Sequence, residues 1–331
     1  MILNKLLERQ IKRHLKSTDL WANPELVELM HSISEAYQHQ EEDRQLIERS
    51  LDLSSAELTD ANQAVRKAYE TIELKNQDMV SSLEYAKLVQ DSMLSKESYL
   101  LKIFPKSFVF NKPKEIVSGD FFWLSQKNGN TYLATVDCTG HGVPGAFMSV
   151  ICFRFLNQAV SDLKLEKPSE ILNYLNTEIK NTITDKIEDQ ESKNALDISM
   201  VKIDHKRRSF EFSGVGQKMF YANGKELLEI KGDKFHIGQN LDPQKHRITS
   251  QEFEIEKDST LYMYSDGFQD QFGGPETKKF GTKRLKDLIE SISDMEIKQQ
   301  KSTIENTFMN WKNGNDQVDD TFFLGVNLSH F

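Results

Sequence analysis

Residues 118–142 read SGDFFWLSQKNGNTYLATVDCTGHG, with two runs rich in aromatic and β-branched residues on either side of Asn128-Gly129. An Asn-Gly pair between such runs is typical of the two-residue type I′ turn of a β-hairpin. We therefore predict a hairpin in which the numbers of facing residues sum to 257. In this register Asp120 lies directly opposite Asp137.

Two facing aspartates need compensation. Facing Cβ atoms in antiparallel strands lie roughly 4.5–5.5 Å apart, a distance at which like charges destabilise a sheet. A raised pKa of one carboxyl group, a basic side chain or a divalent cation could compensate. Neither SGD at 118–120 nor VDCTG at 136–140 contains a basic residue, so a metal ion is the leading explanation. A β-bulge would shift the register by one residue and remove the pairing.

A second pair of acidic positions follows the same pattern. The run TLYMYSD ends at Asp266, and the run TFFLGV begins directly after Asp319 and Asp320. If these runs form antiparallel neighbours, the acids share one rim of a sheet. Spacing alone leaves open whether this pair meets Asp120 and Asp137, and each aspartate taken singly is equally typical of a turn.

Four carboxylates without an obvious nucleophile favour metal-dependent hydrolysis of a phosphate ester. Asp-rich oxygen sites select Mg²⁺ or Mn²⁺, and two such ions can activate a water and stabilise an in-line phosphoryl displacement. The loop GHGVPG at 140–145 leads into a predicted helix, whose first amides could face an anion. A tight turn with Pro144 at the helix start explains this loop equally well.

From about residue 104 the chain alternates short apolar runs with turn residues. We predict strands at 107–111, 121–126, 131–136, 197–203, 209–215, 218–223, 226–230, 260–265 and 321–328. We predict helices at 144–163, 168–184, 282–293 and 297–311. Many strands with segregated helices indicate an α+β fold, in which two packed antiparallel sheets have helices on their outer faces.

The first 118 residues contain no glycine, and no proline lies between Pro24 and Pro105. This composition predicts a short helix at 2–17 and a long helix that begins at Asn23-Pro24, with asparagine as N-cap and proline at the first helical position. Apolar residues recur there at seven-residue steps, namely Leu51, Leu58, Val65, Ile72, Met79, Ala86 and Met93. A coiled coil also needs a second apolar row, three or four residues after each of these positions. That row is poorly filled and includes Ser54, Asn76 and Ser82, which predicts a weak coiled coil. We favour a parallel homodimer over a single helix folded back on the rest of the chain.

Composition excludes several classes of protein. The net charge of −9 argues against a dedicated nucleic-acid binder, which normally carries a basic stripe. No apolar run approaches the length that crosses a bilayer, so we expect no membrane span. Cys138 and Cys152 match no disulfide framework or zinc spacing, which favours free thiols and a cytoplasmic location.

Several ordered motifs together resemble the SpoIIE-like bacterial branch of the metal-dependent protein phosphatase (PPM, protein phosphatase 2C) superfamily. They are VSGDFFW at 117–123, VDCTGHGVPGAFMS at 136–149, IDHKRRSFEFSGVGQKMFY at 203–221, YSDGFQDQFGG at 264–274 and QVDDTFFLGV at 317–326. The segment LEYAKLVQDSML at 83–94 also resembles the helical connector that often enters this domain. The resemblance covers more than 200 residues and implies an αββα sandwich preceded by a long helix.

The resemblance implies a protein serine/threonine phosphatase with two Mn²⁺ or Mg²⁺ ions and a metal-activated water. Asp137 would bridge both ions, the backbone carbonyl of Cys138 would bind one, and Asp120, Asp266 and Asp319 would complete the shells. The substrate would be a phosphorylated signalling protein, such as an anti-sigma-factor antagonist. We assign a helical segment to 1–48, a coiled-coil signalling helix to 49–100 and the phosphatase domain to 101–331.

Some positions depart from the pattern of the superfamily. Thr321 follows Asp320 directly, which leaves open whether Asp319 or Asp320 is the ligand, and we choose Asp319. His141 falls outside the position of the acid proposed in eukaryotic relatives, so we assign it a role in shaping its loop. Asp197 is interpreted as a polar strand start, although a third metal-binding role stays open, and Asp242 and Asp270 are unassigned. A phosphoprotein-binding adaptor without turnover and a hydrolase of small phosphate esters remain alternatives.

Overall fold

The computed structural model describes residues 3–14, 22–183, 195–224, 226–239 and 246–329. The chain divides into two compact units, residues 1–79 and residues 80–331, which are described separately. Asp242, which the sequence left unassigned, lies outside the described residues.

The first unit consists of α1 (Lys5–His14) and most of α2 (Pro24–Met93). Leu7 on α1 packs against Met30 on α2, and the backbone N–H of Asn4 donates to Ser34 Oγ over 2.8 Å. The side chain of Asn23 accepts the N–H of Glu25 over 3.0 Å, which confirms the predicted cap. The N-terminal part of α2 is therefore held both by this cap and by its contacts with α1.

The apolar seam of α2 faces solvent. Leu51, Leu58, Val65 and Ile72 expose between 63% and 68% of their surface. Such a row of exposed apolar side chains at seven-residue spacing is the pattern from which coiled coils form.

The second unit contains two five-stranded antiparallel sheets. The first sheet has the order β1 (Ser107–Lys112), β12 (Thr321–Asn327), β9 (Thr260–Tyr264), β6 (Lys218–Ala222) and β7 (Leu227–Lys231). The second has the order β2 (Phe121–Lys127), β3 (Asn130–Cys138), β4 (Leu196–Asp204), β5 (Ser209–Val215) and β8 (Gln251–Glu254).

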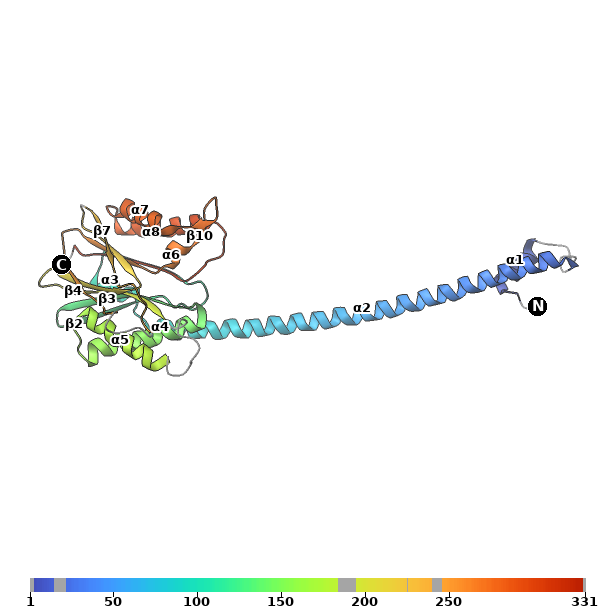
Figure 1. Ribbon diagram of the computed structural model, residues 1–331, viewed down its shortest axis with the longest axis horizontal. Helices are drawn as coiled ribbons and strands as arrows, with labels where there is room; N and C mark the ends of the chain where they lie inside the picture. Colours follow the sequence, from blue (N-terminus) through green and yellow to red (C-terminus); the bar gives the residue numbers. More distant parts are fainter. Residues whose placement is uncertain (1–2, 15–21, 184–194, 225, 240–245, 330–331) are drawn as a thin grey trace. The chain divides into compact units, whose positions relative to one another are not determined.

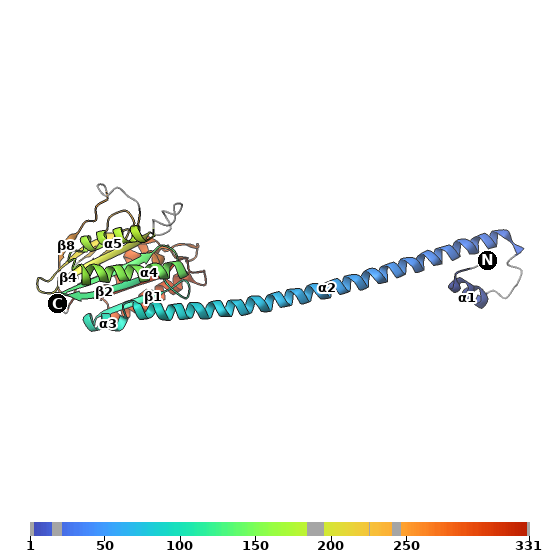
Figure 2. The same cartoon turned by 90° about the horizontal axis from the view of Figure 1, so that it is seen from below.

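Helices cover the outer face of each sheet (Figure 1). On one side lie α4 (Gly142–Asn157), a π-helical turn at Gln158–Asp162 and α5 (Pro168–Ile183), which cross the sheet containing β2 and β4 (Figure 2). On the other side lie α7 (Gly281–Ile292) and α8 (Ile297–Lys312), with the short α6 (Gly267–Asp270) beside them. Separate apolar clusters fill the three interfaces between these four layers. The predicted αββα sandwich is confirmed.

The central hairpin has the predicted register. Phe121 pairs with Val136 and Lys127 with Asn130, so the numbers of facing residues sum to 257. Asn128 and Gly129 have φ values of 54° and 79°, as a type I′ turn requires. The pairing begins at Phe121, and Asp120, which directly precedes β2, lies one residue beyond the last paired position.

Other elements were missing from the sequence prediction or were predicted with different bounds. Strand β8 reads QEFE and is largely exposed, so it carries little apolar signal. The short pair β10 (Phe272–Gly273) and β11 (Lys278–Lys279) was also missed. The helical path stops at Met93 and resumes as α3 (Glu97–Ile103), whereas one continuous helix was expected.

The segment Gly142–Asp162 is long and apolar enough to cross a bilayer by length and composition alone. In the structure it lies against the second sheet, where Cys152, Leu156 and Ala159 are fully buried. Its apolar character is therefore explained by the interior of the domain.

The turn at Asn128-Gly129 yields a stability prediction. Gly129→Ala should lower the free energy of unfolding by about 1–2 kcal/mol, because an L-residue is strained at φ 79°. Asn128→Gly should have almost no effect, because glycine adopts the positive φ of this position and is also favoured there. Urea denaturation of both variants measures the difference. Equal destabilisation by the two substitutions would contradict the turn assignment.

Candidate metal-dependent active site

Strand alternation brings acidic residues to one end of the space between the sheets. Phe122, Leu133, Val201 and Phe322 belong to the apolar cluster between the sheets. Because every second side chain of a strand faces the same way, the same inner faces carry Asp120, Asp137, Asp197 and Asp320. Each of these acids lies at the same end of the sandwich, where β2, β4 and β12 begin and β3 ends.

Asp120 and Asp137 form the centre of this group. Burial raises the pKa of Asp120 well above its usual value, and the charges of Asp320, Asp319 and Asp266 add to the effect. Burial likewise raises the pKa of Asp137, with further contributions from Asp120 and Asp266. Asp120 Oδ2 is buried and has no hydrogen-bond partner. A buried carboxylate oxygen in this condition is unusual and fits a position that a cation would occupy.

Asp266 joins the same group from the other sheet. It follows β9, and its backbone N–H donates to Asp137 Oδ2 over 3.3 Å. Its neighbour Gly267 approaches β12 so closely that a Cβ there would lie 1.9 Å from the carbonyl oxygen of Asp320. Loss of surrounding water, together with the charges of Asp270 and Asp319, raises the pKa of Asp266 to about 6. The two acidic pairs therefore meet at one rim, which the sequence had left open.

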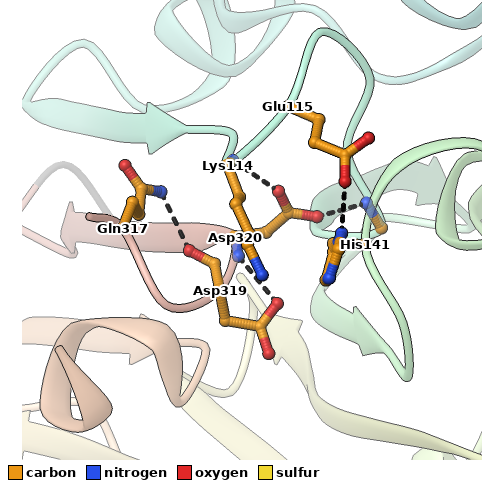
Figure 3. A network of polar contacts seen from close by, with 7 residues as sticks. Lys114, Glu115, His141, Gln317, Asp319 and Asp320 are labelled. Carbon is orange, nitrogen blue, oxygen red and sulfur yellow. Dashed lines mark hydrogen bonds and ion pairs between the residues drawn. The ribbon is translucent and has the colours of Figure 1, made fainter. Parts of the chain in front are cut away.

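Asp319 and Asp320 have different environments (Figure 3). Asp320 is buried, and its two oxygens accept the backbone N–H groups of Lys114 over 2.8 Å and Gly119 over 2.7 Å. This carboxylate fixes the loop that leads to Asp120. Asp319 is half-buried, and burial raises its pKa, although its Oδ1 accepts the N–H of Asp320 over 2.8 Å. The arrangement favours Asp319 as the acid that faces the rim.

Cys138 presents its thiol and its carbonyl group in different directions. The thiol is buried in the cluster between α4 and the second sheet, and burial raises its pKa well above the usual value. A Cβ on Gly119 would lie 2.9 Å from the carbonyl oxygen of Cys138, so this oxygen faces the loop that carries Asp120. His141, which follows β3, contacts Glu115 Oε1 through its Nδ1 and so links its own loop to the loop that carries Asp120, in keeping with a role in loop shape (Figure 3).

Three further residues lie at this rim that sequence reasoning did not assign, namely Asp197, Gly216 and His236. Asp197 faces Asp137 in the β3–β4 register, and its carboxylate contacts His236 Nδ1. Burial raises the pKa of Asp197, and His236 opposes that rise. Gly216 has a φ of +72°, and a Cβ there would lie 1.9 Å from Asp197 Oδ1. The sequence carried one signal for this cluster, which is that Asp197 begins a strand as the other acids do.

The chemistry of these donors fits divalent cations. Within the described ranges, no three His, Cys, Asp or Glu side chains lie close enough to form a complete metal shell. Burial, with a further contribution from the neighbouring carboxylates, nevertheless raises four carboxyl pKa values, those of Asp120, Asp137, Asp266 and Asp319. Carboxylate and carbonyl oxygens with excess negative charge are the ligands that Mg²⁺ and Mn²⁺ prefer.

Comparisons with known proteins agree with this fold. The structure resembles the SiaA-PP2C domain of Pseudomonas aeruginosa with a TM-score of 0.70 and 25% sequence identity, covering 77% of this chain and 98% of that domain. The PP2C phosphatase domain with a regulatory fragment of SpoIIE from Bacillus subtilis gives a TM-score of 0.54 at 16% identity, covering 67% of this chain and 63% of that one. The RsbU and RsbW domains of a Mycobacterium tuberculosis protein give 0.52 at 16% identity, covering 68% and 60%. The last two likenesses concern the fold alone.

The fold is that of a PP2C-type serine/threonine phosphatase domain, a class of metal-dependent enzymes. Residues 127–329 match the family Stage II sporulation protein E (SpoIIE), and the chain belongs to this family. A comparison with curated proteins finds no match.

The crowding of acids yields a second stability prediction. In protein kept free of metal with EDTA, Asp266→Asn should raise the free energy of unfolding at pH 7 by about 1 kcal/mol, a value that allows for solvent screening of an exposed carboxylate. The folded-state pKa of Asp266, about 6, lies above its usual value of 3.8, so ionisation costs stability increasingly between pH 3.8 and 6 and fully above 6. The gain should shrink as the pH falls through 6, when wild-type Asp266 becomes protonated.

Urea denaturation as a function of pH measures this gain. Asp287→Asn, on the exposed face of α7, serves as the matched control and should change nothing. A loss of stability in metal-free Asp266→Asn would contradict the described crowding.

Proposed function

We propose that the chain removes phosphate from phosphoserine or phosphothreonine on a partner protein, with two Mn²⁺ or Mg²⁺ ions at the acidic rim. Asp120, Asp137, Asp266, Asp319 and the backbone carbonyl of Cys138 would hold the ions. The observation that supports this assignment most is that acids from both sheets converge at one place, where burial and then their neighbouring charges raise their pKa values.

The residues around the proposed site position the acids that would hold the ions. When bound, divalent cations would act as Lewis acids and lower the pKa of a water that attacks phosphorus. Asp320 holds the 114–119 loop through two backbone amides and so places Asp120. The thiol of Cys138 is buried in an apolar layer, and burial raises its pKa, which argues against covalent attack by sulfur.

The proposed substrate is a phosphorylated protein in the cytoplasm. The resemblance to the SpoIIE-like branch suggests a small signalling domain, such as an anti-sigma-factor antagonist. The SiaA-PP2C domain supports the PP2C chemistry at 25% identity over nearly its whole length. Nucleic acid is not a proposed partner, because the net charge of −9 disfavours phosphate backbones.

The helix α2 is proposed to dimerise and to regulate the enzyme. The exposed apolar seam at residues 51–72 supports a parallel coiled coil, and its polar second position makes two packings of similar energy accessible. At the end of α2, the buried side chain of Gln90 donates to Ser118 O over 2.6 Å and to Ser149 Oγ over 2.8 Å. A shift of this turn would therefore act on the residues directly before Asp120.

Hydrolysis of p-nitrophenyl phosphate tests the catalytic proposal. With Mn²⁺ present, Asp137→Asn, Asp266→Asn and Asp319→Asn should each lower turnover by about 100-fold or more, because each removes a proposed ligand. Asp287→Asn should retain the wild-type rate.

The outcomes of this assay separate the alternatives. Activity that survives all three substitutions would contradict the site. A metal-loaded wild type without turnover would instead favour a phosphoprotein-binding adaptor. Preference for nucleotides over phosphopeptides would favour a hydrolase of small phosphate esters.

Substitution of the seam tests the regulatory proposal. The triple variant Ser54→Leu, Asn76→Leu and Ser82→Leu should tighten the dimer and change the phosphatase rate, because leucine fills the poorly packed second position. Light scattering measures the dimer, and p-nitrophenyl phosphate hydrolysis measures the rate. Ala56→Leu, Gln63→Leu and Gln77→Leu add the same side chain outside the seam and provide the control. An unchanged rate in a dimer of confirmed stability would refute the regulatory role of the helix.

A further inference from the structure

A cavity of about 380 Å³ opens directly beside the acidic rim. Its size falls within the range of roughly 300–1,000 Å³ that is typical of ligand pockets. One end is lined by Asp137, Asp197 and Asp266, and the other by residues of β6, β7 and the turn that follows β7. We call this space the side cavity; the proposed metal site uses its acidic end only.

The side cavity contains unsatisfied polar groups. Buried side-chain atoms without a hydrogen-bond partner occur at four described residues, and three of these residues, Gln217, Tyr264 and Gln269, line the side cavity. Gln217 and Tyr264 are only 8% and 3% exposed. Buried polar groups are almost always paired in folded proteins, so three unpaired groups around one cavity indicate a ligand that pairs with them.

The kinds of atoms that lack partners describe this ligand. Gln217 Nε2 is a donor, Gln269 Oε1 is an acceptor, and Tyr264 Oη can serve as either. Gln217 is held in place because its Oε1 accepts from Thr135 Oγ1 over 3.3 Å, which leaves its amide nitrogen for another group. A peptide backbone offers N–H and C=O groups in alternation and so can satisfy donors and acceptors together.

The far end of the side cavity carries a net positive charge, because Lys218, Lys231 and Lys234 outnumber Glu229 and Asp233 there. Lys218 Nζ is neutralised by Glu229 Oε1 over 2.7 Å, and Asp233 accepts the N–H of Thr249 over 2.8 Å. Lys231 and Lys234 also line the side cavity, are exposed, and form no ion pair with any residue in the described ranges. The side cavity therefore has an acidic end at the proposed metal site and two available ammonium groups at the other end.

We infer that the side cavity binds the segment next to the phosphorylated residue of a protein substrate, and that Lys231 and Lys234 select an acidic side chain in that segment. This inference rests on the proposed phosphatase function. Gln217, Tyr264 and Gln269 pair with the peptide backbone, while the phosphate lies at the acidic end with the cations. The occupant is a protein segment, because a small ester would fill the acidic end alone and leave the three polar groups unpaired.

Paired phosphopeptides test the inference. The wild type is assayed with a phosphoserine peptide that carries glutamates on both sides of the phosphoserine and with the same peptide carrying alanines, alongside p-nitrophenyl phosphate. We expect kcat/KM to be about fivefold higher for the acidic peptide, mainly through KM. In the Lys231→Ala, Lys234→Ala double variant this preference should disappear, and in the Lys231→Glu, Lys234→Glu variant it should reverse.

Two further variants separate recognition from general effects. Lys257→Ala removes an exposed lysine before the start of β9, at the opposite end of that strand from Asp266, and should keep the preference. Gln269→Ala should raise KM for both peptides relative to that for p-nitrophenyl phosphate without lowering the melting temperature, because the lost acceptor has no partner within the protein.

The outcomes distinguish this inference from the proposed function. Equal kcat/KM for the two peptides in the wild type, or a preference that persists in the double variant, would overturn the side-cavity assignment while turnover of p-nitrophenyl phosphate still supports a phosphatase. If the metal-loaded wild type hydrolyses none of the three, fluorescence polarisation of labelled peptides decides. Tighter binding of the acidic peptide that requires Lys231 and Lys234 supports the side cavity, and equal binding rejects it.

Discussion

Repulsion among crowded carboxylates is the constraint on which the acidic end of this domain depends. Asp120 and Asp137 lie on one sheet and Asp266 and Asp319 at the end of the other, and burial raises the pKa of all four. Nothing in the apolar core requires these acids at that position. Backbone N–H groups make several of the contacts at this end of the domain, because those of Lys114 and Gly119 donate to Asp320 and that of Asp266 donates to Asp137.

Asp320 illustrates how the fold meets this constraint. Its carboxylate accepts two backbone N–H groups from the loop before Asp120 and is thereby committed to structure. Glycines permit close approaches to two of the acids. Gly267 lies against the backbone of Asp320, and Gly216 lies against the side chain of Asp197. Adjacent acids in the sequence thus have separate tasks, with Asp320 supporting the loop and Asp319 left toward the rim.

The sequence predicted the layers and the central hairpin well, because both follow from local rules. The Asn-Gly turn determined the β2–β3 register, and alternation determined which acids face inward. Convergence of the two acidic pairs could not be predicted, since it depends on how one sheet packs on the other. The contact of Asp197 with His236 was missed for the same reason, because 39 residues separate them. Strand β8 was missed because its exposed, charged residues show no apolar alternation.

The placement of the two thiols has a consequence for the conditions under which the domain can operate. Cys138 directly follows Asp137, yet its sulfur lies in the apolar layer beneath α4 together with Cys152, and both are buried. Oxidation and alkylation of cysteine proceed through an accessible thiolate, and burial of both thiols disfavours that form. The domain is therefore built to tolerate peroxide and electrophiles at concentrations that would inactivate an enzyme whose chemistry requires an exposed sulfur.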